Sequence, residues 1–284
     1  MINNEIRNKT FDEERALYHL SDTLVSDCQF SGPADGESAL KEARNIVCDG
    51  CRFDLRYPLW HVKGLILKHS LMAETARAAL WYTSHGEISD CNLAGIKVLR
   101  ECDNIRIRNC EIISAECGWK CRNVDIAETD INSEYFGLNS RDISLYNVSF
   151  KGKYSFQYTE NVTIENCFLD TKDAFWHAKN VTVRYCTIKG EYLGWYSEGL
   201  TLISCRIIGT QPLCYARNLK MVDCEMEGAD LAFEYSSVDA KLDGSVVSIK
   251  NPSAGHIECD SVGEIILDDA VYPTECEIVV RDKK

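Results

Sequence analysis

Apolar and polar residues alternate in a phrase that recurs along this chain every 19 residues. The phrase opens with Asn, Asp or Gly, places apolar residues one and three positions later, and reaches a small anchor residue at the sixth, as in NIRIRNCEI, NVTIENCFL and NVTVRYCTI. Apolar residues at every second position are typical of a strand buried on one face. The anchors that follow one another at this spacing are Cys91, Cys110, Thr129, Val148, Cys167, Cys186, Cys205 and Cys224.

The residues that flank these strands favour turns. Asn, Asp and Gly tolerate the left-handed backbone conformation that a tight corner requires. A second polar corner precedes many anchors, another apolar position follows the anchor, and a third stretch completes the unit. The opening residues are Asn45, Asn104, Asn123, Asp142, Asn161, Asn180, Gly199 and Asn218.

Three short strands and three corners in 19 residues predict an all-β fold, a single-stranded right-handed parallel β-helix. In such a solenoid, equivalent positions of successive coils stack about 4.8 Å apart. A leucine-rich-repeat horseshoe is the alternative, although its unit is longer, roughly 20 to 29 residues, and needs room for a helix or its substitute. A left-handed helix of hexapeptides would repeat in multiples of six residues, which this chain does not.

The repeat covers nearly the whole chain, so we expect one domain over residues 1–284. A solenoid has no size limit set by a single core, because each coil contacts only its neighbours. We expect repeating coils over residues 21–250 and closing strands over 251–284. Residues 1–20 are expected to cap the first coil, or to form a first irregular strand.

The formal charge of -13 argues against nucleic acid or an anionic membrane as the main partner, since both attract clustered Lys and Arg. The sequence has no run of 18 apolar residues, and its first 20 residues lack the basic start and apolar core of a secretory signal. These features predict a cytoplasmic protein.

The 15 cysteines are explained by their positions. An odd number in a long chain without an export signal does not favour a disulfide framework. Most fall in inward columns, where a thiol packs as a small apolar side chain. The pair Cys48 and Cys51 has zinc-like spacing but no partner pair, so neither a metal nor a cofactor is expected.

The third stretch of each unit is richer in large polar and aromatic side chains than packing requires. One column holds all five tryptophans, which we expect to point inward, and the next column is expected to face solvent. Aromatic rings can cover the C–H faces of a sugar while charged groups bond its hydroxyls, and stacking that merely stabilises a sheet is the alternative. The candidate ligand-binding residues are Trp60, His61, Trp81, Tyr82, Lys97, Arg100, Glu101, Glu116, Lys120, Tyr135, Tyr154, Tyr158, Tyr192, Tyr196 and Tyr215.

Two groups of residues in these stretches have the composition of a catalytic site. Asp173, Glu191 and His177 are the first candidates, because paired carboxyl groups on adjacent coils suit glycoside hydrolysis and a His suits proton transfer. Strand alternation would place Asp173 on the outer face. The second group contains Lys97, Arg100, Glu101, Glu116 and Lys120. Opposite charges on neighbouring coils also describe a purely structural ladder of ion pairs.

Several long strings resemble a known bacterial family, domain of unknown function family 3737. They are GESALKEA, YPLWH, ARAALWY, GIKVLREC, GKYSFQYTEN, TKDAFWHAKNVTV, GEYLGWYSEGLTLI, GTQPLCYARNL and SIKNPSAG, and they span almost the whole chain. The resemblance implies a fold similar to the pectin-lyase-like right-handed β-helix. It implies no activity and no site residues.

The residues therefore predict a β-helix protein that binds a carbohydrate or sugar conjugate along a lateral face, with a non-catalytic scaffold or protein-interaction module as the alternative. Whether the protein is an enzyme stays open at this point. If it is one, it is expected to be a carbohydrate-active hydrolase or lyase. The sequence does not determine its oligomeric state.

Overall fold

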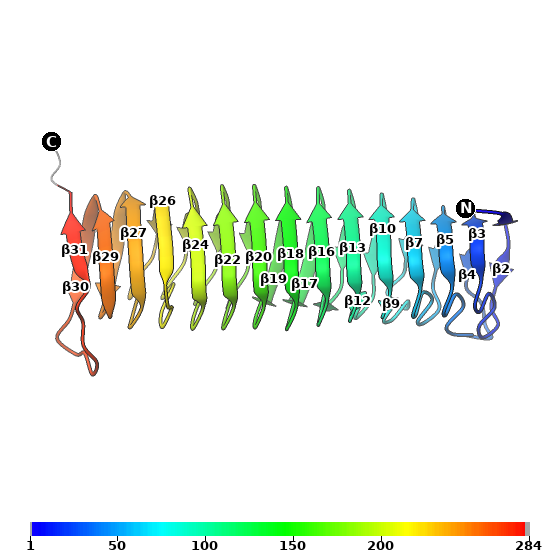
Figure 1. Cartoon of the computed structure of the whole chain (residues 1–284), viewed down its shortest axis with the longest axis horizontal. Coiled ribbons are helices and arrows are strands. Elements are labelled where there is room, and N and C mark those ends of the chain that lie inside the picture. Colours follow the sequence, from blue (N-terminus) through cyan, green and yellow to red (C-terminus); the bar gives the residue numbers. More distant parts are fainter. Residues whose placement is uncertain (1, 282–284) are drawn as a thin grey trace. The chain divides into compact units, whose positions relative to one another are not determined.

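The computed structural model describes residues 2–281, which form strands and turns and contain no helix. The chain divides into two compact units, Met1–Ser144 and Leu145–Lys284. Within each unit the chain winds into right-handed parallel coils of about 19 residues, and the long strands lie side by side (Figure 1). The predicted β-helix is confirmed, and the leucine-rich horseshoe is excluded. None of the described residues belongs to a helix that could cross a membrane; the cytoplasmic location stays a prediction.

In unit 1 the long strands pair in register, so that Ile46, Leu65, Gly86, Ile105 and Val124 stand one above the next. The long strands are β1 (Asn4–Arg7), β3 (Ser21–Ser26), β5 (Arg44–Asp49), β7 (Lys63–Lys68), β10 (Ser84–Ser89), β13 (Asp103–Arg108) and β16 (Arg122–Ala127). The second side is made of β2 (Thr10–Phe11), β4 (Gln29–Phe30), β6 (Arg52–Phe53), β8 (Leu71–Met72), β11 (Asn92–Ala94), β14 (Glu111–Ile113) and β17 (Asp130–Phe136). The third side contains β9 (Leu80–Trp81), β12 (Leu99–Arg100) and β15 (Glu116–Cys117), and the end of β17 pairs with β15 there.

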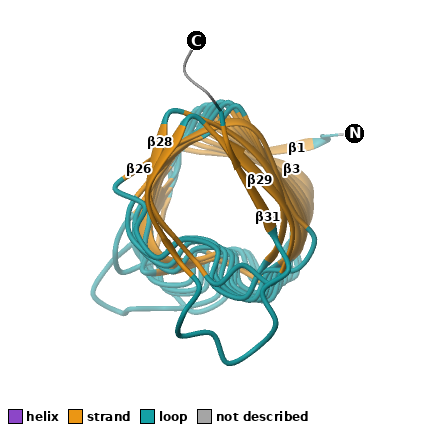
Figure 2. Cartoon of the chain, turned by 90° about the vertical axis from the view of Figure 1, so that its left-hand side faces the viewer, coloured by secondary structure: helices purple, strands orange, loops and turns teal. Residues whose placement is uncertain are grey.

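Unit 2 repeats this plan, with strands along two sides of the coil and loops along the third (Figure 2). Its long strands are β20 (Glu160–Glu165), β22 (Lys179–Arg184), β24 (Glu198–Ile203), β26 (Leu219–Glu227), β27 (Ser237–Asp243), β29 (Ala254–Cys259) and β31 (Glu277–Val280). The second side contains β19 (Ser149–Ser155), β21 (Phe168–Asp170), β23 (Thr187–Lys189), β25 (Arg206–Ile208), β28 (Ser245–Lys250) and β30 (Ser261–Ile266). Strand β18 (Arg141–Tyr146) includes the boundary residues of the two units.

At the ends of the chain the structure gives strands. β1 pairs with β3 and β2 with β4, so residues 4–11 form strands that belong to a first coil. β29, β30 and β31 occupy the segment predicted to close the last coils. Met1 of the predicted cap and residues 282–284 of the predicted closing strands lie outside the described residues. That the chain is a single domain stays a prediction.

The predicted corners are confirmed by the backbone angles. Asn104, Asn123 and Asn180 open their strands with φ of 63°, 52° and 53°, and the second corner repeats the left-handed conformation at Asn109 and Asn166. Asn adopts this conformation more readily than most residues that carry a Cβ. The polar residues at these positions therefore bend the chain between strands.

The third side differs from the prediction, and the difference changes which side chains face solvent. Asp173, Phe175 and His177 all have left-handed backbones, with φ of 53°, 61° and 54°, so this stretch is a series of turns. Two-residue alternation applies only to an extended strand. Phe175 is fully buried, and the next two residues, Trp176 and His177, both lie outward of it, half-buried and exposed.

The expectation that the tryptophan column points inward is therefore wrong. All five tryptophans are half-buried on the outside of the third side, and each stands directly after an inward residue. Trp176 and Trp195 stack with ring centroids 5.5 Å apart. The guanidinium of Arg100 lies between Trp81 and Trp119, at 5.1 and 5.3 Å from their ring centroids.

The cysteine anchors are buried and hydrogen-bonded. Fourteen of the cysteines are buried free thiols and Cys276 is half-buried, which confirms the structural interpretation of the described ones. The backbone N–H of Cys91 donates to Sγ of Cys110 at 3.4 Å, and the N–H of Cys110 donates to Oγ1 of Thr129 at 3.3 Å. In these pairs the anchor side chain accepts a hydrogen bond from the coil before it, as Cys167 and Cys186 also do. Ser70 does the same for the N–H of Cys51, at 3.0 Å.

This arrangement predicts that Cys110→Ala lowers the free energy of unfolding by more than the lost packing of one sulfur atom would. Alanine would leave the buried N–H of Cys91 without an acceptor, which costs about 1 to 3 kcal/mol, whereas Cys110→Ser keeps an acceptor of the kind that Ser70 provides. Urea denaturation of the three proteins measures the difference. Equal free energies of unfolding for the alanine and serine variants would contradict the role of the side chain as acceptor.

Candidate functional site

Unit 2 contains a hollow of about 440 Å³ at the corner where the third side meets the long strands. One margin consists of aromatic side chains that end the third side, and the other consists of charged side chains that begin the long strands. Seven residues line it: His177, Tyr196, Tyr215, Tyr235, Lys179, Glu198 and Arg217.

The aromatic margin is a regular stack of rings from successive coils. The His177 ring lies 4.9 Å from that of Tyr158 and 5.0 Å from that of Tyr196, with interplanar angles of 7° and 6°. Tyr196 and Tyr215 follow at 4.8 Å and 12°. We call these four residues, Tyr158, His177, Tyr196 and Tyr215, the ring stripe.

The stacking decides which part of each ring a ligand can meet. His177 and Tyr196 each have a ring against both faces, so solvent reaches mainly their edges and polar atoms. Tyr158 is 53% exposed and Tyr196 46% exposed. Ring faces are therefore not the platform that we expected for sugar C–H groups. The stripe instead presents polar atoms, at intervals of one coil, along ring edges that carry partial positive charge.

The ring stripe has a defined end within unit 2. Tyr235 is tilted by 41° from Tyr215, and Tyr272 meets it edge-on with centroids 5.1 Å apart. The backbone N–H of Val271 donates to the Tyr235 hydroxyl at 3.1 Å. Partial burial and the neighbouring Glu234 carboxylate raise the pKa of Tyr215, so its hydroxyl keeps its proton at neutral pH and can donate a hydrogen bond.

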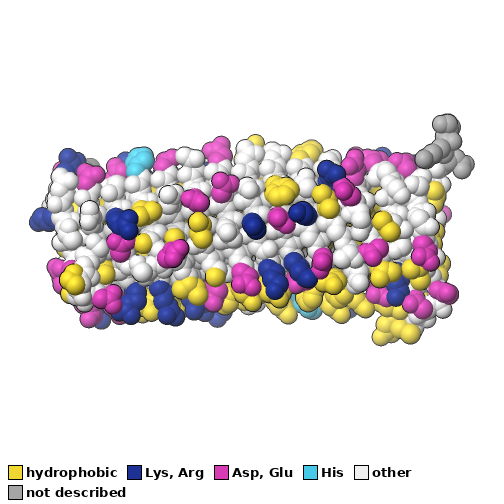
Figure 3. All heavy atoms as spheres, turned by 180° about the vertical axis from the view of Figure 1, so that it is seen from behind, with side chains coloured by type: hydrophobic (Ala, Val, Ile, Leu, Met, Phe, Trp, Pro, Cys, Tyr) yellow, Lys and Arg dark blue, Asp and Glu magenta, His cyan; other side chains and the backbone are white. Residues whose placement is uncertain are grey.

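The charged margin runs parallel to the stripe. Lys179 pairs in register with Glu198 through β22 and β24, and Glu198 forms a bridge to Arg217. All three are exposed, and none makes an ion pair or a side-chain hydrogen bond with another residue of the described range 2–281. Elsewhere charged side chains of both signs are interspersed, as on the face shown in Figure 3, and many of them are paired.

The predicted catalytic residues are only partly brought together. Asp173 was expected on the outer face but is buried, with 6% exposure, because the left-handed turns end the alternation. Burial raises the pKa of its carboxyl group, an effect that the charges of Lys172 and Lys153 oppose. Glu191 is on the adjacent coil, where its backbone carbonyl accepts the N–H of Asp173 at 3.0 Å and its carboxylate pairs with Lys172 at 2.6 Å. His177 belongs to the ring stripe instead.

The second predicted group is assembled in unit 1 as a network of ion pairs. The carboxylate of Glu116 lies 3.6 Å from both Lys97 Nζ and the Arg100 guanidinium, and Glu101 lies 3.9 Å from Arg100. Lys120 is exposed and takes no part in these pairs. Ion pairs around a guanidinium that lies between two indole rings are typical of a structural ladder of charges, which is the alternative that the sequence left open.

The other predicted ligand residues lie on the outside of the third side. In unit 1, Trp60 stacks on Trp81 at 5.9 Å and His61 on Tyr82 at 4.6 Å. Tyr135 is exposed and meets Trp119 edge-on. In unit 2 the ammonium groups of Lys153 and Lys172 lie 4.6 and 5.2 Å from the ring centroids of Tyr154 and Tyr192. These positions agree with an outward location and do not test a binding role.

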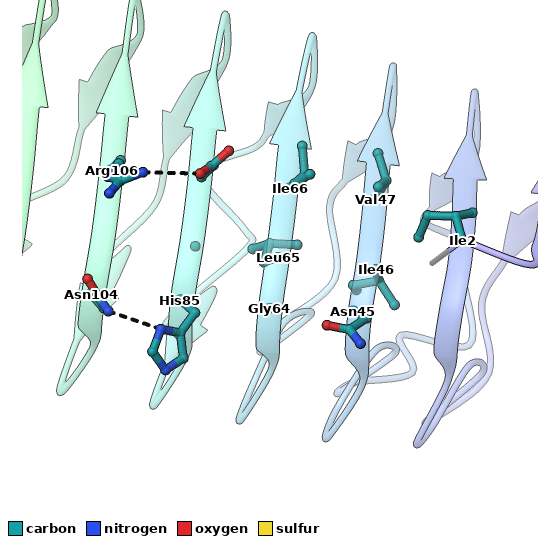
Figure 4. Close-up of a pocket in the computed structure, with 12 residues that line it drawn as sticks. Ile2, Asn45, Ile46, Val47, Gly64, Leu65, Ile66, His85, Asn104 and Arg106 are labelled. Carbon is teal, nitrogen blue, oxygen red and sulfur yellow. Dashed lines mark hydrogen bonds and ion pairs between the residues drawn. The ribbon is translucent and has the colours of Figure 1, made fainter.

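A second hollow of about 440 Å³ lies on the outer face of unit 1, across β5, β7, β10 and β13 (Figure 4). Gly64 and Gly86 are among the residues that line it. Its polar groups are already satisfied, since Arg106 pairs with Glu87 at 3.3 Å and Asn104 bonds His85 at 3.0 Å. The hollow of unit 2, with its unpaired charges, is the better candidate.

The sequence interpretation missed four residues that line this hollow: Lys179, Glu198, Arg217 and Tyr235. A signal was present for the first three, because the residue before the opening position carries a charge in most coils of the repeat. The pattern could not show that three of these charges stay unpaired, which depends on side-chain geometry.

Comparisons with solved structures find proteins of low similarity to this chain. The structure is similar to the surface adhesin PfbA of Streptococcus pneumoniae, with a TM-score of 0.43 and 10% identity over 76% of this chain and 71% of that chain. It is also similar to the A-module of the mannuronan C-5 epimerase AlgE6 of Azotobacter vinelandii, with a TM-score of 0.33 and 12% identity over 99% and 89%. At these TM-scores neither protein's role transfers to this chain.

No curated protein matches the sequence. A family model, described as "Protein of unknown function (DUF3737)", matches residues 4–279. The match covers nearly the whole length, and it agrees with the resemblance that the repeated strings indicate. The chain therefore belongs to the DUF3737 family.

Proposed function

We propose that the hollow of unit 2 binds a carbohydrate between the ring stripe and the charged margin. The observation that carries this proposal is the set of unpaired charges, Lys179, Glu198 and Arg217, which face a column of ring edges across 440 Å³. Tyrosine hydroxyls donate and accept hydrogen bonds, a carboxylate only accepts, and Lys and Arg only donate. A polyhydroxylated ligand can use all of these groups together.

The chemistry of the hollow favours a sugar over a protein partner. Protein interfaces are centred on buried apolar or aromatic anchors that fill pockets. Here the ring faces are covered by neighbouring rings, and the accessible groups are ring edges, hydroxyls and charges. A scaffold or protein-interaction role remains the alternative, and it becomes the better account if no saccharide binds.

Replacing Tyr196 by Phe tests the site with the smallest possible change. The variant removes one hydroxyl from an exposed ring and keeps the stack, so the fold should be unaffected. The loss of one hydrogen bond to the ligand, about 1 kcal/mol, is expected to weaken binding about fivefold. Isothermal titration calorimetry with an oligosaccharide panel measures this effect.

Tyr185→Phe is the matched control for that measurement. Tyr185 is in the same unit, is 59% exposed and has the same left-handed backbone, but it stands at a different corner of the coil. Its variant should bind as tightly as the wild type. Equal weakening by both substitutions, or no binding of any oligosaccharide to the wild type, would refute the proposed site.

A hydrolytic role is a second candidate because of Asp173. A buried carboxyl group with a raised pKa suits a general acid, and a second carboxyl group, that of Glu191, is supplied by the adjacent coil. If the protein is a hydrolase, Asp173→Asn should abolish turnover of a bound oligosaccharide and leave binding intact. An absence of turnover by the wild type would leave the binding function alone.

A further inference from the structure

We infer that the ligand of this hollow is an unbranched glycan that lies parallel to the coil axis of unit 2, with one sugar for each coil and alternate sugars facing opposite ways, as in β-1,4-linked chains. This inference rests on the proposed carbohydrate binding. It adds the direction, the length and the linkage geometry of the ligand.

The direction follows from the two margins of the hollow. The ring stripe advances by 4.9, 5.0 and 4.8 Å between successive centroids, and the charged margin advances by one coil at each residue. A ligand lying across the stripe would meet one ring and one charge. A ligand lying along it meets several of each, and a sugar in an extended glycan spans a distance comparable to the rise of one coil.

The linkage geometry follows from the signs of the charges. Glu160, Lys179, Glu198 and Arg217 follow one another in register, so an acceptor and a donor alternate from coil to coil. The same chemical group therefore recurs at every second coil. In a β-1,4-linked chain each sugar is turned by about half a revolution from the one before, so the same edge also recurs at every second sugar. An α-1,4-linked glucan curls and departs from a straight row.

The length follows from the end of the stripe. Four rings, from Tyr158 to Tyr215, are stacked regularly, and the tilted Tyr235 with the edge-on Tyr272 ends the pattern. We therefore expect about four sugars to be held, one for each regular ring.

The test uses the full chain and calorimetry with β-1,4-linked oligomers of glucose, N-acetylglucosamine and mannose, from two to six sugars, with maltohexaose as the α-1,4-linked comparison. For at least one β-linked series the affinity should rise with each sugar up to about four and then level off. The β-linked hexasaccharide of that series should bind at least tenfold more tightly than maltohexaose.

A variant at the far end of the ring stripe distinguishes a glycan that extends along the whole stripe from a sugar that binds only in the hollow. Tyr158→Phe should weaken binding of the β-linked hexasaccharide about fivefold. A disaccharide can still bind in the hollow lined by His177 to Tyr235, so its affinity should fall by less than that of the hexasaccharide.

The failure of this inference differs from the failure of the proposed function. Affinity independent of length, maltohexaose binding as tightly as the β-linked chains, or an unchanged hexasaccharide affinity in Tyr158→Phe would overturn the inference and leave sugar binding in place. If none of these saccharides binds, carbohydrate binding itself is refuted.

Discussion

Replacing Gly190 by alanine is expected to destabilise unit 2 by about 4 kcal/mol or more. Gly190 has φ of 151°, and a Cβ built on it would lie 1.6 Å from the backbone carbonyl oxygen of Thr171. That oxygen belongs to the preceding coil and has no flexible side chain to yield. The two coils would have to separate where the N–H of Thr171 donates to Lys189 O at 2.7 Å.

Gly228→Ala is the control for this prediction. Gly228 also has a positive φ, 64°, but nothing lies within 4 Å of its virtual Cβ. Its substitution adds only the cost of a left-handed alanine, about 1 kcal/mol. Chemical denaturation of both variants should rank them clearly. If Gly190→Ala is no less stable than Gly228→Ala, the contact between the coils is not as close as the structure shows.

Replacing Phe175 by alanine is expected to cost about 3 to 5 kcal/mol. Phe175 is fully buried, and its ring stacks on that of Phe156 with centroids 5.2 Å apart. The truncation leaves a cavity between coils whose backbones are fixed by hydrogen bonds above and below. Thermal and urea denaturation should both report the loss.

Phe168→Ala provides the comparison for the cavity. Phe168 is in the same unit, on β21, but is 46% exposed on the outer face. Its truncation should change the free energy of unfolding by about 0.5 kcal/mol, as for most surface positions. Similar losses for the two variants would contradict the placement of Phe175 in the core.

The fold could be predicted because its determinants repeat. The apolar columns, the left-handed corner residues such as Asn104 and Asn180, and the small buried anchors recur at one spacing, so each coil confirms the interpretation of the others. The family resemblance agrees with that result. The hydrogen-bonding role of the anchors was less evident, although Ser70 and Thr129 in the cysteine column point to it.

The third side could not be predicted in the same way. Its left-handed residues include Tyr196 and Phe175, whose residue types do not indicate a turn, so two-residue alternation was applied where no strand exists. The tryptophans and Asp173 were misplaced for this reason. The aromatic column itself was recognised, because its composition exceeds what packing requires.

The unpaired charges are a property of three-dimensional geometry. Lys179 and Glu198 stand opposite each other in register, as do Arg122 and Asp103 in unit 1, yet only the second pair is bonded, at 2.8 Å. Sequence reports neighbouring opposite charges in both cases. The directions of the side chains decide that Arg122 and Asp103 form an ion pair and that Lys179 and Glu198 do not.

The anchor hydrogen bonds have a consequence for how this chain is made. The N–H of Cys91 bonds to a side chain 19 residues later, and the N–H of Cys110 to one a further 19 residues on. On the ribosome, a coil with such a donor therefore waits for the next coil before that buried N–H is satisfied. At these coils the growing end of the nascent polypeptide keeps one buried donor without an acceptor until the next anchor has been translated.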